Sequence, residues 1–393
     1  MMVKISIIWI IGLAIALTSG LTTMGAIAKY KAPELAITLS PINGFAIESV
    51  VSKSIKTSIG ENGGKFPDNM DSRIAEFARH AFIAEPITPS AIAVIALHQA
   101  PPNKQRLMNK ALALSRRQPL VTAWMIADSG ARSDLTGLLH NYDTILRTST
   151  SAASVIIPLI VDTLVNDKFV TPLASVLNKQ PPWAYQFWEA VDSNPEAIGN
   201  AARLRKMLYK PNESDHIFRD AKLIRALVRN QQFETAESLY HLLVGKKDAG
   251  FLINNGSFET EPEYFPIDWQ LFSTGGYGAV VTDGMLKISA IPNSGGLLAR
   301  QLIKLPAQVI RVEIKLSGPI PDNAQIIISL RCAQEIKNAA QITRIPLEQQ
   351  IENLKIDNSN SVCNFYWLDI NGHASENGNG FDTNLESINI VPL

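Results

Sequence analysis

The sequence predicts a multidomain chain with α structure followed by β structure. We expect an N-terminal membrane helix, an array of α-helical hairpins and a C-terminal antiparallel β-sandwich. Three observations predict this order. Residues 5–28 carry no charge, residues 71–245 repeat apolar side chains with a helical period, and residues 251–393 alternate apolar and polar side chains. The length of 393 residues also exceeds the ~150 residues typical of one domain.

The composition excludes several classes of protein. The chain contains 36 basic and 36 acidic residues, and zero net charge argues against a nucleic-acid-binding protein. Two cysteines are too few for a disulfide-rich scaffold, and 46% apolar residues exclude a wholly disordered chain. The charge is unevenly distributed, because residues 251–393 hold 9 basic against 15 acidic residues and residues 1–250 hold 27 against 21. This asymmetry also indicates two different parts.

Residues 5–28 are predicted to anchor the chain in a membrane. Lys4 and Lys29 bracket these 24 uncharged residues, which at about 1.5 Å per residue cross a hydrocarbon layer of ~30 Å. The apolar stretch runs past the usual signal-peptide length, which favours an uncleaved anchor. A signal peptide cleaved after residues 26–28 and a buried core helix are the alternatives. We expect a bacterial inner-membrane protein with its soluble part in the periplasm, or else a secreted protein.

Residues 29–70 are predicted to form a linker between the membrane segment and the folded part. The stretch from 54 to 68 is polar, and it holds Gly60, Gly63, Gly64 and Pro67. Such a composition breaks regular structure and is typical of spacers.

Residues 71–245 are predicted to form a helical domain. Apolar residues fall at positions i, i+3, i+4, i+7 and i+8, which is the spacing of one helix face. The clearest case is the set Ile74, Phe77, Ala78, Ala81 and Phe82. Candidate N-caps precede several such segments, namely Asp71, Ser90, Asn103 and Asp134. We expect roughly ten helices of about 10–15 residues, joined by short turns.

One helix pair in this domain resembles a tetratricopeptide repeat. The turn at 230–233 is followed by Ala236 and Tyr240, a small residue and an aromatic one spaced as in the second helix of such a repeat. The tryptophan–leucine–glycine signature of the first helix is missing. The resemblance implies a TPR-like array that docks other envelope proteins on a concave face. A compact helical domain without a binding groove is the alternative.

Residues 251–393 are predicted to form an antiparallel sandwich of about eight to ten short strands. Apolar residues at 310, 312, 314 and 316 alternate with Arg311, Glu313 and Lys315. Clusters of glycine, proline, asparagine and aspartate separate the alternating runs. Cys332 and Cys363 both fall in strand-like segments of this domain, so we expect one disulfide and an oxidising compartment. Two buried free thiols are the alternative.

The start of this domain resembles a family of carbohydrate-binding modules with a galactose-binding-like jelly roll. The run Asn255-Gly256-Ser257-Phe258-Glu259 resembles their opening motif, Trp269 follows it, and Gln301-Leu302 resembles a later pair. This likeness covers about a third of the chain. It implies a glycan-binding or calcium-binding sandwich, although a fold does not fix a function.

Sugar rings stack on aromatic side chains, so the resemblance makes the aromatic residues of this domain the candidate carbohydrate-binding residues. They are Tyr277, Trp269, Trp367 and Tyr366. Tyr277 follows two glycines and is the best loop candidate, whereas a place in the sandwich core is the alternative for Trp269 and Trp367. For a structural calcium ion, the resemblance implies Glu259 of the opening motif, and Asp382 is the nearest second carboxylate.

No nucleotide-binding, hydrolase or metalloprotease motif occurs in the sequence. We therefore expect a non-catalytic envelope scaffold or accessory protein for cell-surface polysaccharide export or assembly, without a cofactor other than calcium. Its expected partners are other envelope proteins and polysaccharide, not nucleic acid. A dedicated carbohydrate-binding protein and a polysaccharide-processing enzyme are the alternatives.

Overall fold

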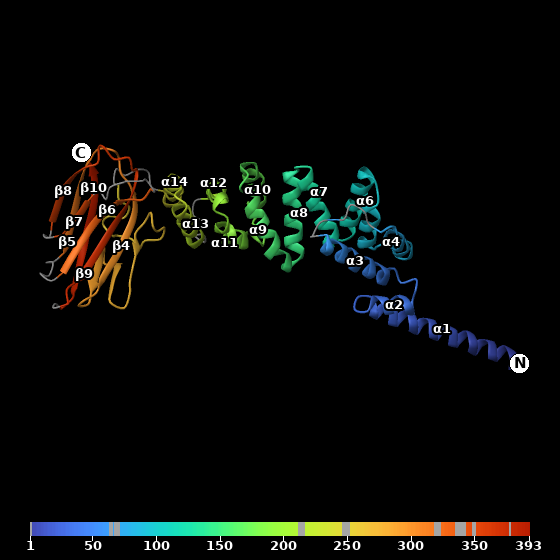
Figure 1. The fold of residues 1–393 in the computed structure, drawn as a ribbon. Coiled ribbons are helices and arrows are strands. Elements are labelled where there is room, and N and C mark those ends of the chain that lie inside the picture. Colours follow the sequence, from blue (N-terminus) through green and yellow to red (C-terminus); the bar gives the residue numbers. More distant parts are fainter. Residues whose placement is uncertain are drawn as a thin grey trace. The chain divides into compact units, whose positions relative to one another are not determined.

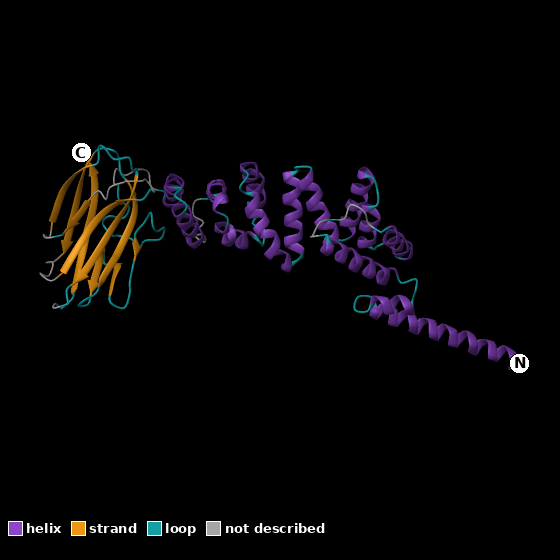
Figure 2. Cartoon of the chain, in the orientation of Figure 1, coloured by secondary structure: helices purple, strands orange, loops and turns teal. Residues whose placement is uncertain are grey.

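The computed structural model confirms the predicted fold class, with helices followed by two antiparallel β-sheets (Figures 1 and 2). It describes residues 2–62, 66, 71–210, 217–245, 252–317, 324–334, 343–347, 351–376 and 379–393. The chain forms two compact units. The first comprises residues 1–157 and 175–184, and the second comprises residues 158–174 and 185–393. The second unit therefore contains both the last helices and the sandwich.

The N-terminal helix α1 (Met2–Ala28) contains a candidate membrane span, Trp9–Ala28. The span is long enough to cross a bilayer and sufficiently apolar. Only 6% of its most apolar window is buried within the structure, so its side chains do not form part of a protein core. This exposure argues against the buried core helix and fits both an anchor and a signal sequence.

The linker predicted for residues 29–70 is wrong over most of its length. The structure places α2 (Pro33–Leu39) and α3 (Gly44–Glu61) there. Asn43 caps α3 by accepting a hydrogen bond from the backbone amide of Ala46, and Ile47, Val51 and Ile55 form its buried stripe. These residues have the i, i+4, i+8 spacing of an amphipathic helix. The helix-breaking residues that motivated the linker cluster at and beyond the end of α3, and those at 63, 64 and 67 lie outside the described residues.

The rest of the first unit consists of short helices in succession. Pro89, Pro101 and Pro119 occupy the first turns of their helices, where a missing amide hydrogen costs no hydrogen bond. Asp71 and Asp134 cap helices as predicted, whereas Ser90 and Asn103 lie inside helices that those prolines begin. The helices are α4 (Ser72–Ala84), α5 (Pro89–Leu97), α6 (Pro101–Leu114), α7 (Pro119–Ala131), α8 (Leu135–Thr148) and the start of α9 (Ala153–Thr163).

The helices of the second unit end in a tightly packed group. After α10 (Val170–Leu177) and α11 (Ala184–Ala190) follow α12 (Ile198–Leu208), α13 (Ile217–Arg229) and α14 (Phe233–Val244). A buried ion pair between Arg205 of α12 and Asp220 of α13 joins two of these helices. The turn between α13 and α14 places Gln231 at φ +57°. Ala236 and Tyr240 are buried. The resemblance of this pair to a tetratricopeptide repeat stays a prediction.

Over its described residues, the sandwich consists of two five-stranded antiparallel sheets. The first sheet has the order β1 (Gln270–Leu271), β4 (Gly295–Lys304), β9 (Phe365–Ala374), β6 (Ala324–Cys332), β7 (Thr343–Pro346). The second sheet has the order β2 (Tyr277–Thr282), β3 (Met285–Ala290), β10 (Phe381–Pro392), β5 (Val309–Ser317), β8 (Ile351–Asp357).

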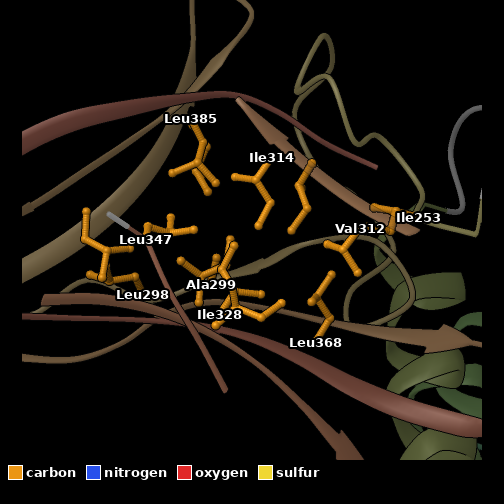
Figure 3. Close-up of a cluster of buried hydrophobic side chains, with 14 of the residues drawn as sticks. Ile253, Leu298, Ala299, Val312, Ile314, Ile328, Leu347, Leu368 and Leu385 are labelled. Carbon is orange, nitrogen blue, oxygen red and sulfur yellow. The ribbon is translucent and has the colours of Figure 1, made fainter. Parts of the chain in front are cut away.

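Apolar side chains from both sheets fill the space between them (Figure 3). Val312 and Ile314 of β5 face Leu368 of β9 and Ile328 of β6 across this core. The alternation predicted over residues 310–316 is confirmed, because every second residue of β5 is buried.

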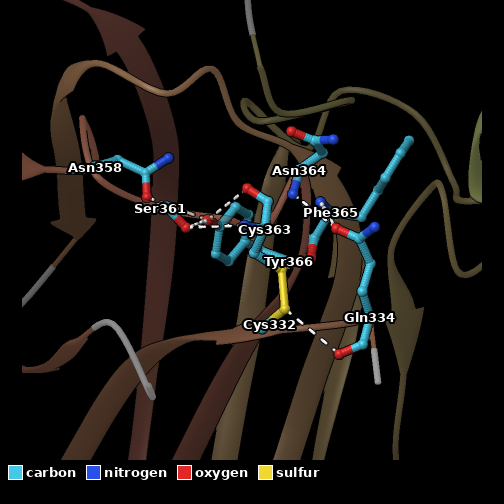
Figure 4. The surroundings of a disulfide bond; sticks show 8 residues. All are labelled: Cys332, Gln334, Asn358, Ser361, Cys363, Asn364, Phe365 and Tyr366. Atoms are coloured by element: carbon cyan, nitrogen blue, oxygen red, sulfur yellow. Dashed lines mark hydrogen bonds between the residues drawn. A yellow bond between two sulfur atoms is a disulfide. The ribbon is translucent and has the colours of Figure 1, made fainter. Parts of the chain in front are cut away.

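A disulfide joins Cys332, the last residue of β6, to Cys363, just before β9 (Figure 4). The two Cα atoms are 6.0 Å apart, and the cysteines are 31 positions apart in the sequence. Beside the disulfide, the buried hydroxyl of Tyr366 donates to the side-chain oxygen of Asn358 at 3.1 Å. The disulfide and this hydrogen bond together fix the segment that leads into β9.

Helix α14 packs directly on the first sheet, and both α13 and α14 contact the loop before β1. The rings of Phe233 and Phe365 lie 5.2 Å apart, and those of Tyr240 and Tyr264 lie 6.0 Å apart. Burial raises the pKa of Tyr264 to about 12, with the charge of Asp220 adding to the effect, so this phenol is neutral at physiological pH. The helices and the sandwich therefore share an apolar contact, and a site can draw residues from both.

Candidate functional site

Two of the four predicted aromatic residues lie in the sandwich core. Trp269 is 1% exposed, and its indole nitrogen donates to the backbone oxygen of Asn255 at 3.1 Å. Tyr366 is fully buried, in phase with the core residues Leu368 and Ile370 of β9. Neither ring presents a face to solvent. Their burial removes both from the residues that can stack on a sugar.

Tyr277 lies at the start of β2 with its ring against β4. A Cβ atom on Gly296 would fall 2.5 Å from the Tyr277 hydroxyl oxygen, so the glycine is what makes room for the ring. The side chain is partly buried against the core, and it lines a shallow hollow with Asp382 and Lys287. The structure thus brings Tyr277, a predicted carbohydrate-binding residue, near Asp382, a predicted calcium ligand. The ring of Tyr277, however, packs against β4.

The two predicted calcium ligands, Glu259 and Asp382, lie in different segments of the sandwich. The amide of Ile388 donates to the oxygen of Gly256, which places the opening motif beside that part of β10. Asp382 is six residues, or about 20 Å, further along the strand, while Glu259 is at most ~11 Å from Gly256. These bounds place Glu259 and Asp382 in different segments of the sandwich, and their pairing as calcium ligands stays a prediction. Within the described residues, no group of three or more histidine, cysteine or acidic side chains forms a metal site.

The opening motif instead ties the start of the domain to the first sheet. The side chain of Gln301, in β4, accepts from the amide of Asn254 at 3.0 Å and donates to its carbonyl at 2.8 Å. Asn255 adopts φ +51°, and its side chain bonds the backbone of Thr260. These contacts give the asparagine and glutamine of the signature a structural role.

Trp367 lies on the outer face of the first sheet, opposite in phase to Tyr366. In the sheet register it stands between Leu302 of β4 and Arg331 of β6. Its ring is partly exposed, and the guanidinium carbon of Arg300 lies 5.1 Å from the ring centre. Of the four aromatic candidates, Trp367 is the one held at the surface by a sheet and flanked by a charged group.

A charged network surrounds Trp367 on this face. The carboxylate of Asp369 accepts from Nε and Nη2 of Arg300 at 2.6 and 3.1 Å, and from Arg331 at 3.3 Å. The Asp369 side chain is 8% exposed, whereas that of Arg331 is 46% exposed. One buried carboxylate therefore orients two guanidinium groups, and Arg331 retains hydrogen-bonding capacity toward solvent.

Trp367 also lines a hollow of about 370 Å³ that the sandwich shares with α13 and α14. This volume falls within the range of small-ligand sites. We call it the Trp367 hollow. Its walls combine aromatic rings, amides and guanidinium groups. The sandwich domain contributes Trp367, Phe265 and Gln270, α13 contributes Arg225 and Arg229, and the turn after α13 contributes Gln231.

The two helical arginines of the Trp367 hollow lie near an aromatic ring and other charged groups. Arg225 lies over the ring of Phe265, 4.6 Å from its centre. Burial lowers the pKa of Arg225, the nearby charge of Arg229 lowers it further, and the charge of Asp192 acts in the opposite direction. Within the described residues neither guanidinium forms an ion pair. The sequence signal for this pair is only a spacing of four on one helix, and nothing in the sequence connects it to Trp367.

Comparisons with known proteins find similar solved structures, two of which are described below, and no family. No protein-family model and no curated protein matches the sequence. A structure of TmCBM61 in complex with β-1,4-galactotriose is similar to this chain at 14% identity with a TM-score of 0.26, covering 36% of this chain and 99% of that one. A structure of CBM4 is similar at 17% identity with a TM-score of 0.24, over the same shares. At these scores the ligands of those proteins say nothing about the ligand of this chain.

Proposed function

We propose that this protein is a non-catalytic, membrane-anchored envelope protein that binds a glycan in the Trp367 hollow. Its role would be that of a scaffold or accessory factor in the export or assembly of cell-surface polysaccharide. The observation that carries the proposal is the partly exposed ring of Trp367 on a sheet face, next to guanidinium and amide groups. An aromatic surface with a few convergent polar groups is the chemistry that sugar rings and their hydroxyl groups require.

Two further features support a location outside the cytoplasm. The apolar helix α1 provides either an anchor or an export signal, and a disulfide is typical of oxidising compartments such as the bacterial periplasm. The short helices of residues 71–245 supply surface for other envelope proteins, which is the second half of the proposed role.

The test is glycan binding by the full-length protein in detergent micelles. Immobilised neutral and acidic polysaccharides would be screened first, and the affinity for each retained polymer would be measured by calorimetry. Replacing Trp367 by alanine removes the ring and is expected to weaken binding at least tenfold, as for a buried aromatic anchor.

Two matched variants serve as controls. Tyr277→Ala removes the other partly exposed candidate ring, and Tyr185→Ala removes an exposed aromatic ring of α11. Both should retain the wild-type affinity. A glycan that binds Trp367→Ala as tightly as the wild type would place its site elsewhere. Failure of every polymer to bind the folded protein would leave protein docking as the function.

A further inference from the structure

The first sheet carries an excess of positive charge that the rest of its domain does not share. Its strands contain four basic residues and one acidic residue, Asp369. The strands of the second sheet contain four basic and five acidic residues. The first sheet is therefore positive within a domain, residues 251–393, that has 9 basic and 15 acidic residues in all. This uneven distribution places the positive charge on the sheet that bears Trp367.

Register brings most of these charges into one row. Arg300, Asp369, Ser329 and Arg344 are neighbours across β4, β9, β6 and β7, and Arg331 lies one row away beside Trp367. The single negative charge of Asp369 can neutralise only one of the three positive charges of Arg300, Arg331 and Arg344. The fourth basic residue, Lys304, pairs with Glu237 of α14 at 3.2 Å.

Helix α13 adds two more cations from the opposite wall of the Trp367 hollow. Arg225 and Arg229 are one helical turn apart, and like charges at this spacing repel each other. The C-terminal end of a helix favours basic residues, which accounts for a charge at Arg229. It does not account for placing both guanidinium groups around one hollow. The nearby Asp192 pairs with Lys222, and within the described residues neither Arg225 nor Arg229 forms an ion pair. An anionic ligand would relieve this repulsion.

We propose that the ligand of the Trp367 hollow is an acidic polysaccharide whose sugar units carry carboxylates. The inference rests on the proposed glycan-binding function and names its substrate class. The carboxylates pair with Arg225 and Arg229, which line the hollow, because a guanidinium group binds a carboxylate through two parallel hydrogen bonds. Arg331 lies beside Trp367 in the sheet register. The ring of Trp367 meets the sugar, and the amides of Gln231 and Gln270 are placed for its hydroxyl groups. A neutral glycan would leave Arg225 and Arg229 without an ion-pair partner among the described residues.

The test compares polymers that differ only in charge. Full-length protein in detergent micelles would be titrated with polygalacturonate and with its fully methyl-esterified form, which has the same backbone without carboxylates. Alginate and hyaluronate would be tested as two further uronate polymers. We expect at least one uronate polymer to bind, with an affinity that falls steeply as sodium chloride is raised. We also expect the esterified polymer to bind at least tenfold more weakly than polygalacturonate if the latter is the ligand.

Two double variants distinguish binding at the Trp367 hollow from general attraction of a polyanion to positive charge. Arg225→Gln with Arg229→Gln removes two cations from the hollow and is expected to weaken uronate binding at least tenfold. Arg311→Gln with Lys355→Gln removes two cations from the second sheet and should leave binding within twofold of the wild type. Arg229→Gln alone changes an exposed residue, so it still tests the site if the change at Arg225 disturbs the fold.

The outcomes distinguish this inference from the proposed function. Binding of neutral polymers that requires Trp367, without uronate binding, overturns the inference and leaves the glycan-binding function intact. Equal weakening by both double variants, or equal binding of double-stranded DNA, overturns the inference by showing general attraction of polyanions. Absence of binding to any polymer overturns the proposed function and this inference with it.

Discussion

The buried ion pair of Arg205 and Asp220 is predicted to hold one wall of the Trp367 hollow in place. The Nε atom of Arg205 lies 2.6 Å from Oδ1 of Asp220, and Nη2 lies 2.9 Å from Oδ2. The side chains are 8% and 5% exposed, so both hydrogen bonds lie out of water. The pair joins α12 to α13, the helix that carries Arg225 and Arg229.

Replacing Arg205 by methionine would leave the Asp220 carboxylate buried without its partner. Breaking a buried pair in this way costs about 3–5 kcal/mol. For a body of 150–250 residues, each kcal/mol lowers the unfolding midpoint by about 2–4 °C, so we expect a fall of roughly 6–20 °C for the second unit. Replacing both residues together, Arg205→Met with Asp220→Leu, removes the stranded charge and should recover most of this loss.

The assay is thermal unfolding of the full-length protein in detergent, followed by circular dichroism, with glycan binding measured at a temperature below the transition. Arg203→Met is the matched control, because Arg203 is exposed on the same helix. The reasoning would be refuted if Arg205→Met lowered the midpoint no more than Arg203→Met. It would also be refuted if the double variant were as unstable as the single one.

Three further predictions follow. Reducing the disulfide of Cys332 and Cys363, which are 31 positions apart, should lower the free energy of unfolding by about 3–4 kcal/mol in the chain-entropy model. Denaturant unfolding with and without a reductant measures this difference. Phe233→Ala should lower the free energy of unfolding by about 3–5 kcal/mol, because the ring is 3% exposed and packs against Phe365. The same change should weaken glycan binding. Phe218→Ala, at an exposed position, should change neither stability nor binding. Glu48→Gln should remove a pH dependence, because burial raises the pKa of the Glu48 carboxyl above 4.5.

The sign of the Glu48 effect follows from linkage. The folded protein holds this proton more tightly than the unfolded chain, so the wild type is stabilised below pH 4.5, and this stabilisation is lost as the pH rises through the higher folded pKa. The stability of the wild type relative to Glu48→Gln should therefore fall with rising pH over that window. Unfolding midpoints of both proteins across the window check this, and a constant difference would contradict it. Equal stability of the oxidised and reduced protein would likewise contradict the disulfide prediction.

Much of the fold could be predicted from the sequence, because it depends on local periodicity. Every second residue of β5 is apolar, and that phase alone identifies a half-buried strand. The error at α3 also has a local cause. Three glycines and a proline at its end dominated the composition, although Ile47, Val51 and Ile55 already had helical spacing. Averaging the composition over residues 29–70 concealed the helical periodicity of residues 47–55.

The phase of β9 also held information about the aromatic candidates. Tyr366 alternates in step with Leu368 and Ile370, whereas Trp367 is in step with Asp369 and Asn371. Neighbouring residues of a strand point to opposite faces, so one of the two rings had to face outward. Because Asp369 and Asn371 are polar, Trp367 is the ring that faces outward. Apolar character alone does not separate two adjacent aromatic residues.

The charged half of the site depends on tertiary contacts that no local pattern encodes. Arg300 and Asp369 are 69 positions apart and meet only through the register of β4 and β9. Arg225 and Arg229 reach Trp367 only because α14 packs on β9 through Phe233 and Phe365. Resemblance to a carbohydrate-binding module directs attention to the sandwich alone and therefore omits the helical wall.

The shared wall determines how the function has to be tested. A fragment of residues 251–393 keeps Trp367, Arg300 and Arg331, but it lacks the helix that supplies the guanidinium groups of Arg225 and Arg229. It would also expose the ring of Phe365, which α14 covers in the intact chain. If the ligand is acidic, the isolated sandwich should bind it more weakly than the full-length protein does, and its binding should depend less on salt. Weak binding by that fragment would therefore reflect the missing helical wall, and the affinity of the full-length chain is the quantity that decides the function.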